Sequence, residues 1–102
     1  AGQVSVGDIA SLSESGFTTV ICNRPDHEDP GQPTAANIAE ACEKFSLAFH
    51  HMPFKGNGLT PELVGAFRDV IDGADGRVFA YCRSGQRCAF IWEHAKRLPP
   101  AS

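Results

Sequence analysis

The sequence predicts an α/β domain in which a parallel sheet is flanked by helices. Three short runs, at 17–22, 48–52 and 77–81, have the pattern of strands, and the first is rich in the β-branched residues that buried strands favour. Segments with apolar residues at helical spacing lie between these runs and after the last one. Strands that alternate with helices are joined by right-handed crossovers, so we expect a parallel sheet covered on both faces.

The first elements expected along the chain are a short helix and a strand. Asp8 gives the helix over 8–12 an acidic start, and Gly16 ends it. The strand at 17–22 reads FTTVIC. Residues 23–33 (NRPDHEDPGQP) hold three prolines and a glycine, which exclude regular structure and make this segment the longest loop of the domain.

Two helices and a second strand are expected next. Thr34 can cap a helix that runs to about residue 45, and the strand at 48–52 and a loop over 53–58 follow it. Thr60 caps the second helix, which has proline at its first position. The residues expected on the core faces of these two helices are Ile38, Ala41, Cys42, Phe45, Leu63, Val64, Phe67, Val70 and Ile71.

The last strand, at 77–81 (RVFAY), leads into a final helix. This helix starts at Arg87, and the proline pair at 99–100 stops it. Its apolar residues are Phe90, Ile91, Ala95 and Leu98.

Length and charge exclude several classes of protein. A chain of 102 residues is long enough for one domain and too short for two, so we expect a single domain over 1–102. It begins with Ala rather than Met, which suggests a piece excised from a longer chain. A net charge of -3 argues against nucleic acid or a membrane surface as partner. No apolar stretch approaches the roughly 20 residues that span a bilayer, and we expect a cytoplasmic protein.

The four cysteines do not indicate a metal centre. Cys22, Cys42, Cys82 and Cys88 form no CxxC pair, and no HxxxH pair accompanies them. The chain carries enough apolar residues to fold without disulfides. We therefore expect reduced thiols, no metal and no cofactor.

The stretch CRSGQR carries the strongest functional signal. Cys82 lies at the carboxyl end of the last expected strand, where ligands bind in parallel α/β sheets. The loop leads into a helix whose free N–H groups and positive dipole end stabilise a thiolate or an anion bound beside it. We expect Cys82 to be the nucleophile, Arg87 to provide a donor fork, and Arg83, Ser84, Gly85 and Gln86 to form a substrate-binding cradle.

This strand, CRSGQR loop and helix resemble the active-site loop of the rhodanese superfamily and, more loosely, the phosphate-binding loop of cysteine-dependent dual-specificity phosphatases. The loop has one residue fewer between cysteine and arginine than such phosphatases have. The whole chain resembles the phosphatase-like domain (DUF442-type) of bacterial β-lactamase-hydrolase-like proteins, whose members are often labelled sulfur transferases. The matching stretches are FTTVICNRPDHEDPGQPT, MPFKGNGLTPE and FAYCRSGQR. The resemblance implies a protein-tyrosine-phosphatase-like fold with a rhodanese-like loop.

Two residues depart from the family pattern. Cys22 stands where Asn is common, and Cys88 stands where Ser commonly follows the loop arginine. Cys88 lies about one helical turn beyond Cys82, a spacing that suggests a resolving thiol. The alternative is a small core residue at the start of the helix.

The choice between phosphatase and sulfur carrier depends on a general acid. A phosphatase needs one to protonate the leaving oxygen. No carboxylate lies between Glu43 and Glu62, where only Lys55 and Asn57 offer polar side chains near the expected site. Acids that can approach from the long loop are Asp26, Glu28 and Asp29. Sulfur transfer through a persulfide makes a smaller proton demand.

We therefore predict a sulfurtransferase that forms a persulfide on Cys82. Its partners would be a small sulfur donor, thiosulfate or a low-molecular-weight persulfide, a thiol acceptor, and a fused or docked enzyme of sulfur metabolism. The alternatives are a cysteine-dependent phosphatase and a non-catalytic sulfur-relay module. Arg24 follows the first strand and is expected at the same edge of the sheet as Cys82. It either binds an anionic substrate or pairs with Asp26 or Glu28. His27 is expected to be solvated.

Overall fold

The computed structural model, which describes residues 1–55 and 58–97, contains a parallel three-stranded sheet in the order β2-β1-β3. The strands are β1 (Phe17–Cys22), β2 (Ala48–His51) and β3 (Arg77–Tyr81). Cys22 at the end of β1 is in register with the last residue of β2 and with the last residue of β3. The three carboxyl ends therefore meet at one edge of the sheet, and the predicted parallel sheet is confirmed.

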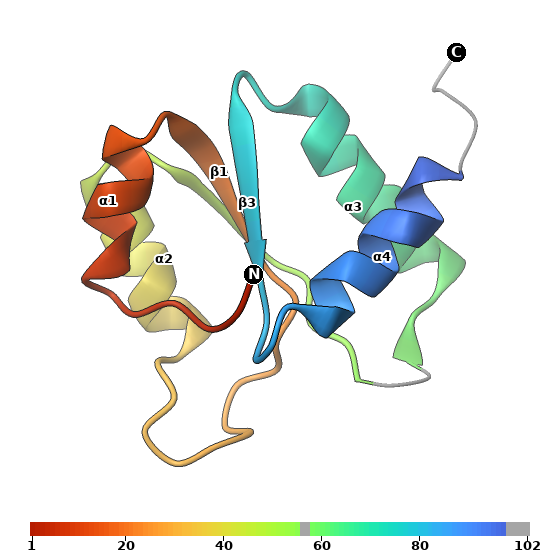
Figure 1. Ribbon diagram of the computed structural model, residues 1–102, viewed down its shortest axis with the longest axis horizontal. Helices are drawn as coiled ribbons and strands as arrows, with labels where there is room; N and C mark the ends of the chain where they lie inside the picture. The colour runs from red at the N-terminus through yellow and green to blue at the C-terminus, as the bar shows by residue number, and fades with distance from the viewer. Residues whose placement is uncertain (56–57, 98–102) are drawn as a thin grey trace.

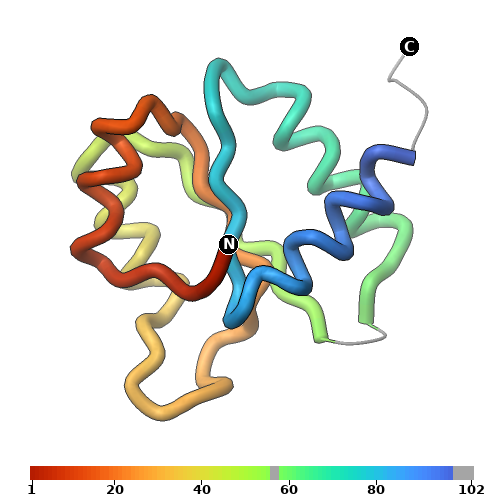
Figure 2. The backbone as a smooth tube through the Cα atoms, in the orientation of Figure 1, coloured from red at the N-terminus to blue at the C-terminus, as the bar shows by residue number. Residues whose placement is uncertain are grey.

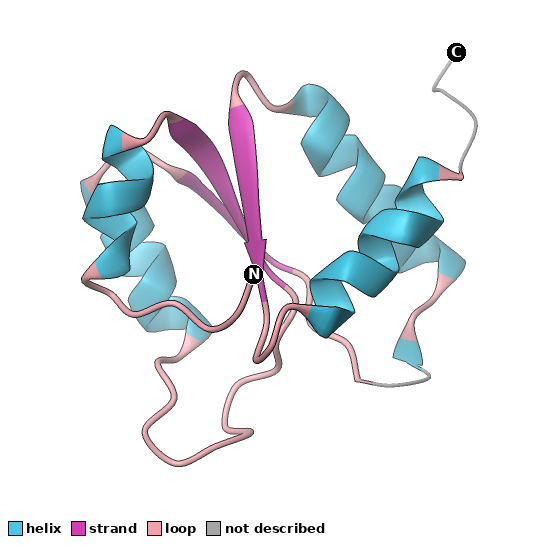
Figure 3. Cartoon of the chain, viewed as in Figure 1, coloured by secondary structure: helices cyan, strands magenta, loops and turns pink. Residues whose placement is uncertain are grey.

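Helices cover both faces of this sheet. α1 (Asp8–Glu14) and α2 (Ala35–Lys44) pack on one face, whereas α3 (Pro61–Gly73) and α4 (Gln86–Lys96) pack on the other (Figures 1 and 3). The predicted caps are confirmed: the hydroxyls of Thr34 and Thr60 accept N–H bonds in the first turns of α2 and α3, each at 3.1 Å.

The central strand β1 is buried on both faces, which divides the core into two parts. Val20 and Cys22 belong to a cluster on the side of α1 and α2, with Ile38 and Tyr81. Ile21 points the other way. Its cluster, on the side of α3 and α4, contains Ile21, Phe54, Val64, Phe67, Ile91 and Ala95. This alternation is what a strand covered on both faces requires.

The amino-terminal segment, which the sequence did not predict to be structured, lies beside the end of β3 and the cysteine loop (residues 82–87). The Ala1 amine donates to the carbonyl of Ala80 at 2.9 Å, and the Ala1 carbonyl accepts from the N–H of Cys82 at 3.0 Å. Gly2 forms an antiparallel bridge with Ser84. Figure 2 shows the chain start beside this loop. Residues 1–3 therefore brace the backbone on which the reactive cysteine lies.

One expectation about an apolar side chain differs from the structure. Phe45, which the helical spacing placed on the core face of its helix, is 40% exposed. On α4, Phe90 is 49% exposed, and Trp92 is exposed as well. Leu98 and Asn57 lie outside the described residues. Within 1–55 and 58–97, no helix is both long and apolar enough to cross a membrane.

Truncation of Ile21 tests the two-sided core. Ile21 has no exposed surface, and we expect Ile21→Ala to lower the free energy of unfolding by about 2–5 kcal/mol, since buried methyl groups are lost and a cavity is left. Urea denaturation measures this loss. Val6→Ala, at a side chain that is 48% exposed, is the control, and an equal loss in both variants would contradict the packing described.

Candidate active site

The site lies at the carboxyl edge of the sheet, where the chain leaves β3 and enters α4. Cys82 directly follows Tyr81, the last residue of β3, and its side chain is only 1% exposed. The end of β1 lies next to the end of β3, because the N–H of Asn23, directly after β1, donates to the carbonyl of Tyr81 at 2.9 Å. The predicted position of the cysteine is thus where the structure places it.

Backbone N–H groups converge on the Cys82 sulfur. The N–H of Gly85 donates to Sγ at 3.0 Å, and Gly85 has a left-handed φ of 92° as the N-cap of α4. Burial raises the pKa of the Cys82 thiol, but the N–H groups of Cys88, Ser84, Gly85 and Arg87 more than offset this, so the pKa lies below its ordinary value. The predicted cradle is therefore a ring of amides that favours a thiolate.

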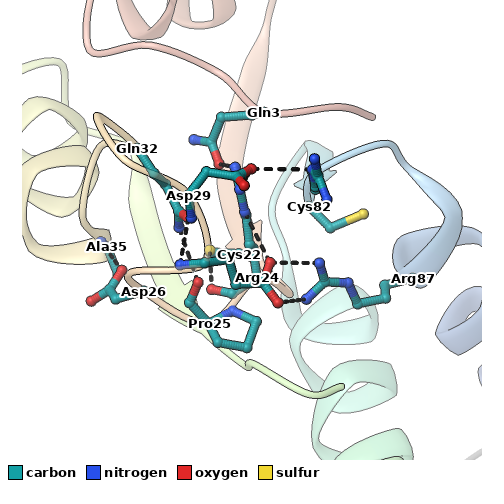
Figure 4. A network of polar contacts seen from close by, with 12 residues as sticks. Gln3, Cys22, Arg24, Pro25, Asp26, Asp29, Gln32, Ala35, Cys82 and Arg87 are labelled. Carbon is teal, nitrogen blue, oxygen red and sulfur yellow. Dashed lines mark hydrogen bonds and ion pairs between the residues drawn. The ribbon is translucent and has the colours of Figure 1, made fainter. Parts of the chain in front are cut away.

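A network of ion pairs surrounds this cradle (Figure 4). Nη1 and Nη2 of Arg87 bind the two carboxylate oxygens of Glu28 at 3.1 and 2.7 Å. Glu28 also accepts from Nε of Arg24 at 3.0 Å, and Nη2 of Arg24 binds Asp29 at 2.6 Å. Asp29 in turn pairs with Arg83 at 3.1 Å. The two carboxylates thus link three arginines into one cluster.

The side chains of this network carry a net positive charge. Three guanidinium groups and two carboxylates leave one positive charge. Hydrogen bonds to Glu28, and to a lesser extent the negative charge of Cys82, raise the pKa of Arg87. The network therefore adds positive potential near the sulfur, while the loop amides are the groups that lower the pKa of the Cys82 thiol.

Glu28 is held in its ionised form. Its hydrogen bonds from Arg87 and then from Arg24 lower the pKa of its carboxyl against the effect of burial, and Glu28 raises the pKa of Arg87 in return. A carboxylate in this state is a poor proton donor. The same acid that the sequence offered as a general acid acts here as an anchor for two arginines.

The other two loop acids are also engaged. Asp26 accepts the N–H of Ala35 at 2.7 Å, at the start of α2. Asp29 binds Arg24 and Arg83, as described above. The sequence analysis left open whether Arg24 meets a substrate or a loop acid. Arg24 is 3% exposed and pairs with Glu28, and with Asp29 rather than Asp26.

A cleft of about 490 Å³ opens over the network. Its lining residues are His27, Glu28, Lys55, Arg83 and Arg87. Three of these five side chains are cationic, so the cleft suits an anionic ligand. Ser84 and Gln86, which complete the loop, are exposed beside it. Among the described residues, no cluster of three or more His, Cys, Asp or Glu could hold a metal ion.

Cys88 lies in the first turn of α4, directly after Arg87. It is 6% exposed, and burial, followed by the negative charge of Cys82, raises the pKa of its thiol to about 12. Its thiol is within hydrogen-bonding reach of the Cys82 sulfur and so stands in for the hydroxyl that serine would offer. A thiol that stays protonated at neutral pH is a weak nucleophile, which favours the core interpretation of Cys88 over a resolving role.

The other two cysteines do not belong to the cleft. Cys22 lies in the cluster with Tyr81, where burial raises the pKa of its thiol, and its Sγ donates to the carbonyl of Arg24 at 3.3 Å. Cys42 is fully buried, and its pKa is raised to about 11.

Sequence reasoning missed the part played by the amino terminus. Oε1 of Gln3 accepts from Nη1 of Arg24 at 2.8 Å, and the N–H of Gln3 donates to the carbonyl of Arg83 at 3.4 Å. Gln3 thus joins the ion-pair network to the cysteine loop. Nothing in the local sequence around residue 3 indicates this contact, which depends on how the segment folds back along β3.

Fold and site together define a phosphatase-like α/β domain in which backbone amides surround a cysteine of lowered pKa. The family model for the phosphatase-like domain of beta-lactamase hydrolase-like proteins matches residues 1–98. The chain belongs to this family. The resemblance stated from the sequence is therefore confirmed.

Curated relatives support the assignment. A beta-lactamase hydrolase-like protein of Agrobacterium fabrum (strain C58) is 35% identical over 92 residues, which make up 90% of this chain and 21% of that protein. A protein of the same name from Xylella fastidiosa is 28% identical over the same length, again 21% of its own chain. This chain thus spans about a fifth of the curated relatives that it matches.

Solved structures share the fold. A candidate phosphatase of Neisseria meningitidis superposes with a TM-score of 0.83 at 35% identity, covering 97% of this chain and 72% of that one. A DUF442 candidate phosphatase of Shewanella putrefaciens has a TM-score of 0.79 at 15% identity, covering 94% of this chain and 60% of that one. The predicted phosphatase-like fold is confirmed by these neighbours.

The reactivity of the Cys82 thiol tests whether the loop amides stabilise its thiolate. We expect iodoacetamide to alkylate Cys82 with a pH midpoint below the ordinary thiol value of 9.0, because the thiolate is stabilised in the loop. Gly85→Ala should raise this midpoint, since a side chain is strained at a φ of 92°. Peptide mass spectrometry follows each cysteine separately, and Cys42 provides the slow reference. A midpoint at or above 9 for Cys82 would refute the cradle.

The pH dependence of the free energy of unfolding tests whether Glu28 is ionised in the folded protein. Its folded pKa lies below the unfolded value near 4.5, so its stabilising effect is complete above about pH 4.5 and is lost as the pH falls through the folded pKa. We expect Glu28→Gln to cost about 1–3 kcal/mol at pH 7 and less in acid. Urea midpoints of both proteins from pH 7 to pH 3 measure this. A pH-independent difference, or an equal cost for the exposed Glu43→Gln, would contradict it.

Proposed function

We propose that this domain is a sulfurtransferase that carries sulfane sulfur as a persulfide on Cys82. One observation carries the proposal: the site stabilises a thiolate, whereas every acid near it is engaged. Asp26 caps α2, Glu28 is held ionised between Arg24 and Arg87, and Asp29 bridges Arg24 and Arg83. Sulfur transfer requires the thiolate but no acid of this kind.

The chemistry of the first half-reaction fits the cradle. The Cys82 thiolate attacks the outer sulfur of thiosulfate, a bond forms between the two sulfurs, and the bond to the sulfonate breaks with its electron pair leaving on sulfite. The negative charge moves from Sγ to the added sulfur. Loop amides and the arginine cluster remain close to that charge throughout, so no large reorganisation is needed.

The second half-reaction passes the sulfur to an acceptor thiol. The acceptor attacks the outer sulfur of the persulfide, and Cys82 leaves as the thiolate that the loop already favours. Lys55, Arg83 and Arg87 line the cleft and give it the positive potential that attracts anionic donors and acceptors. A fused or docked enzyme of sulfur metabolism is the proposed larger setting, supported by the greater length of the curated relatives.

A cysteine-dependent phosphatase is the second candidate. The family name and the names of the solved neighbours favour it, and a ring of N–H groups around a thiolate also suits a phosphoryl group. The missing leaving-group acid argues against it. A sulfur-relay module without turnover of its own is the third candidate, and it shares the persulfide with the first.

Intact-mass analysis distinguishes the three. After incubation with thiosulfate, we expect a mass gain of one sulfur atom that Cys82→Ser abolishes and Cys42→Ser retains, together with release of sulfite and turnover with a small thiol. Loading without turnover would favour the relay module. Absence of loading, with phosphate released from an aryl phosphate in a Cys82-dependent manner, would establish the phosphatase instead.

A further inference from the structure

Among the described residues that line the cleft, His27 alone carries an imidazole. It lies in the long loop between Asp26 and Glu28, is exposed, and lines the cleft together with Lys55, Arg83 and Arg87. The sequence analysis expected only a solvated side chain here. Its exposure is confirmed, but its place beside the anion cradle raises the question of what an imidazole does there.

The backbone holds His27 in an unusual conformation. Its φ is 64°, in the left-handed region that residues with a Cβ rarely adopt. Such strain persists only where the surroundings impose it, and it is concentrated at functional sites. A left-handed φ does not by itself give His27 a chemical role, which has to come from its neighbours in the cleft.

Hydrogen bonds on both sides of His27 fix the loop. Asp26 accepts the N–H of Ala35, and Gln32 closes the loop from within. Oε1 of Gln32 accepts from the N–H groups of Glu28 and Asp29 at 3.1 and 3.3 Å, while its Nε2 donates to the carbonyl of Pro25 at 2.9 Å. The backbone on both sides of His27 is therefore held in place beside the cleft that this residue lines.

The other charged groups of the cleft offer no free base. Arg83 and Arg87 are cations paired with Asp29 and Glu28. Lys55 is a third cationic side chain. Imidazole is the side chain that most often serves as a general base, and among the described residues that line the cleft only His27 carries one.

We propose that His27 is the general base that deprotonates the acceptor thiol in the second half-reaction. This inference rests on the proposed sulfurtransferase function. Neutral imidazole takes the proton of the acceptor, the resulting thiolate attacks the outer sulfur of the Cys82 persulfide, and the S–S bond breaks with its electron pair returning to Sγ. The products are an acceptor persulfide, the Cys82 thiolate and a protonated His27, which then loses its proton to water.

The rate enhancement expected from a general base depends on the pKa of the acceptor thiol. A free alkyl thiol with a pKa near 8.5 is about 3% ionised at pH 7, so full deprotonation accelerates attack by at most about 30-fold. A thiol that is already ionised at pH 7 gains nothing. The nearby cations, Lys55, Arg83 and Arg87, favour the acceptor thiolate once it forms, and the acids closest to His27 in the chain are Asp26, Glu28 and Asp29.

Single-turnover transfer from Cys82 that has been loaded with sulfur in advance tests this role. At pH 7 we expect His27→Asn, which tolerates the left-handed conformation, and His27→Gly to transfer sulfur to 2-mercaptoethanol about 10–30-fold more slowly than the unmodified chain. With the acidic thiol 4-nitrothiophenol, all three proteins should react at the same rate. The difference with 2-mercaptoethanol should also disappear at alkaline pH, where that thiol ionises unaided.

The control is His50→Asn, since His50 lines a hollow formed partly by Thr18 and Ala48 near the opposite ends of the strands. It should leave transfer unchanged. Equal rates for the His27 variants and the unmodified chain with 2-mercaptoethanol would overturn the inference. So would a slowing that is the same with both thiols, because that marks a structural role. Failure of the unmodified chain to load sulfur is a different result, which overturns the proposed function itself.

Discussion

A negative charge on a buried sulfur has to be stabilised by the protein, because water does not reach it. Cys82 is 1% exposed, yet the pKa of its thiol lies below the ordinary value. The loop makes this possible by turning through the left-handed Gly85 directly into the first turn of α4, where N–H groups have no partners within the helix. The strand end, the glycine and the helix start therefore serve one purpose, which is to point donors at one atom.

The ion-pair network extends this arrangement outwards. Glu28 binds Arg87 and Arg24, and Arg24 in turn reaches Gln3 at the amino terminus. A loop rich in proline and acids would otherwise have little reason to be ordered, and here its carboxylates are used to position cations. The consequence for chemistry is a site in which the described acids of the loop, Asp26, Glu28 and Asp29, all have hydrogen-bond or ion-pair partners.

Most of the secondary structure could be predicted from the sequence, because its signals are local. Thr34 and Thr60 cap the helices that follow them, and the alternation of strands and helices fixed a parallel sheet. The prediction of a core position failed at Phe45. Helical spacing identifies which residues share a face, but it does not say how far along that face the neighbouring layer extends.

By itself, the sequence determined that Cys82 ends a strand, that a glycine-containing loop follows, and that a helix start lies close to the sulfur, since all three are contiguous in the chain. Only the tertiary structure decided which acid meets which arginine. Glu28 and Arg87 are separated by 59 positions, and Gln3 and Arg24 by 21. Such pairs form because the parallel register brings the loops after β1 and β3 to one edge of the sheet and because residues 1–3 lie beside that edge. No local pattern in the sequence encodes contacts between residues so far apart in the chain.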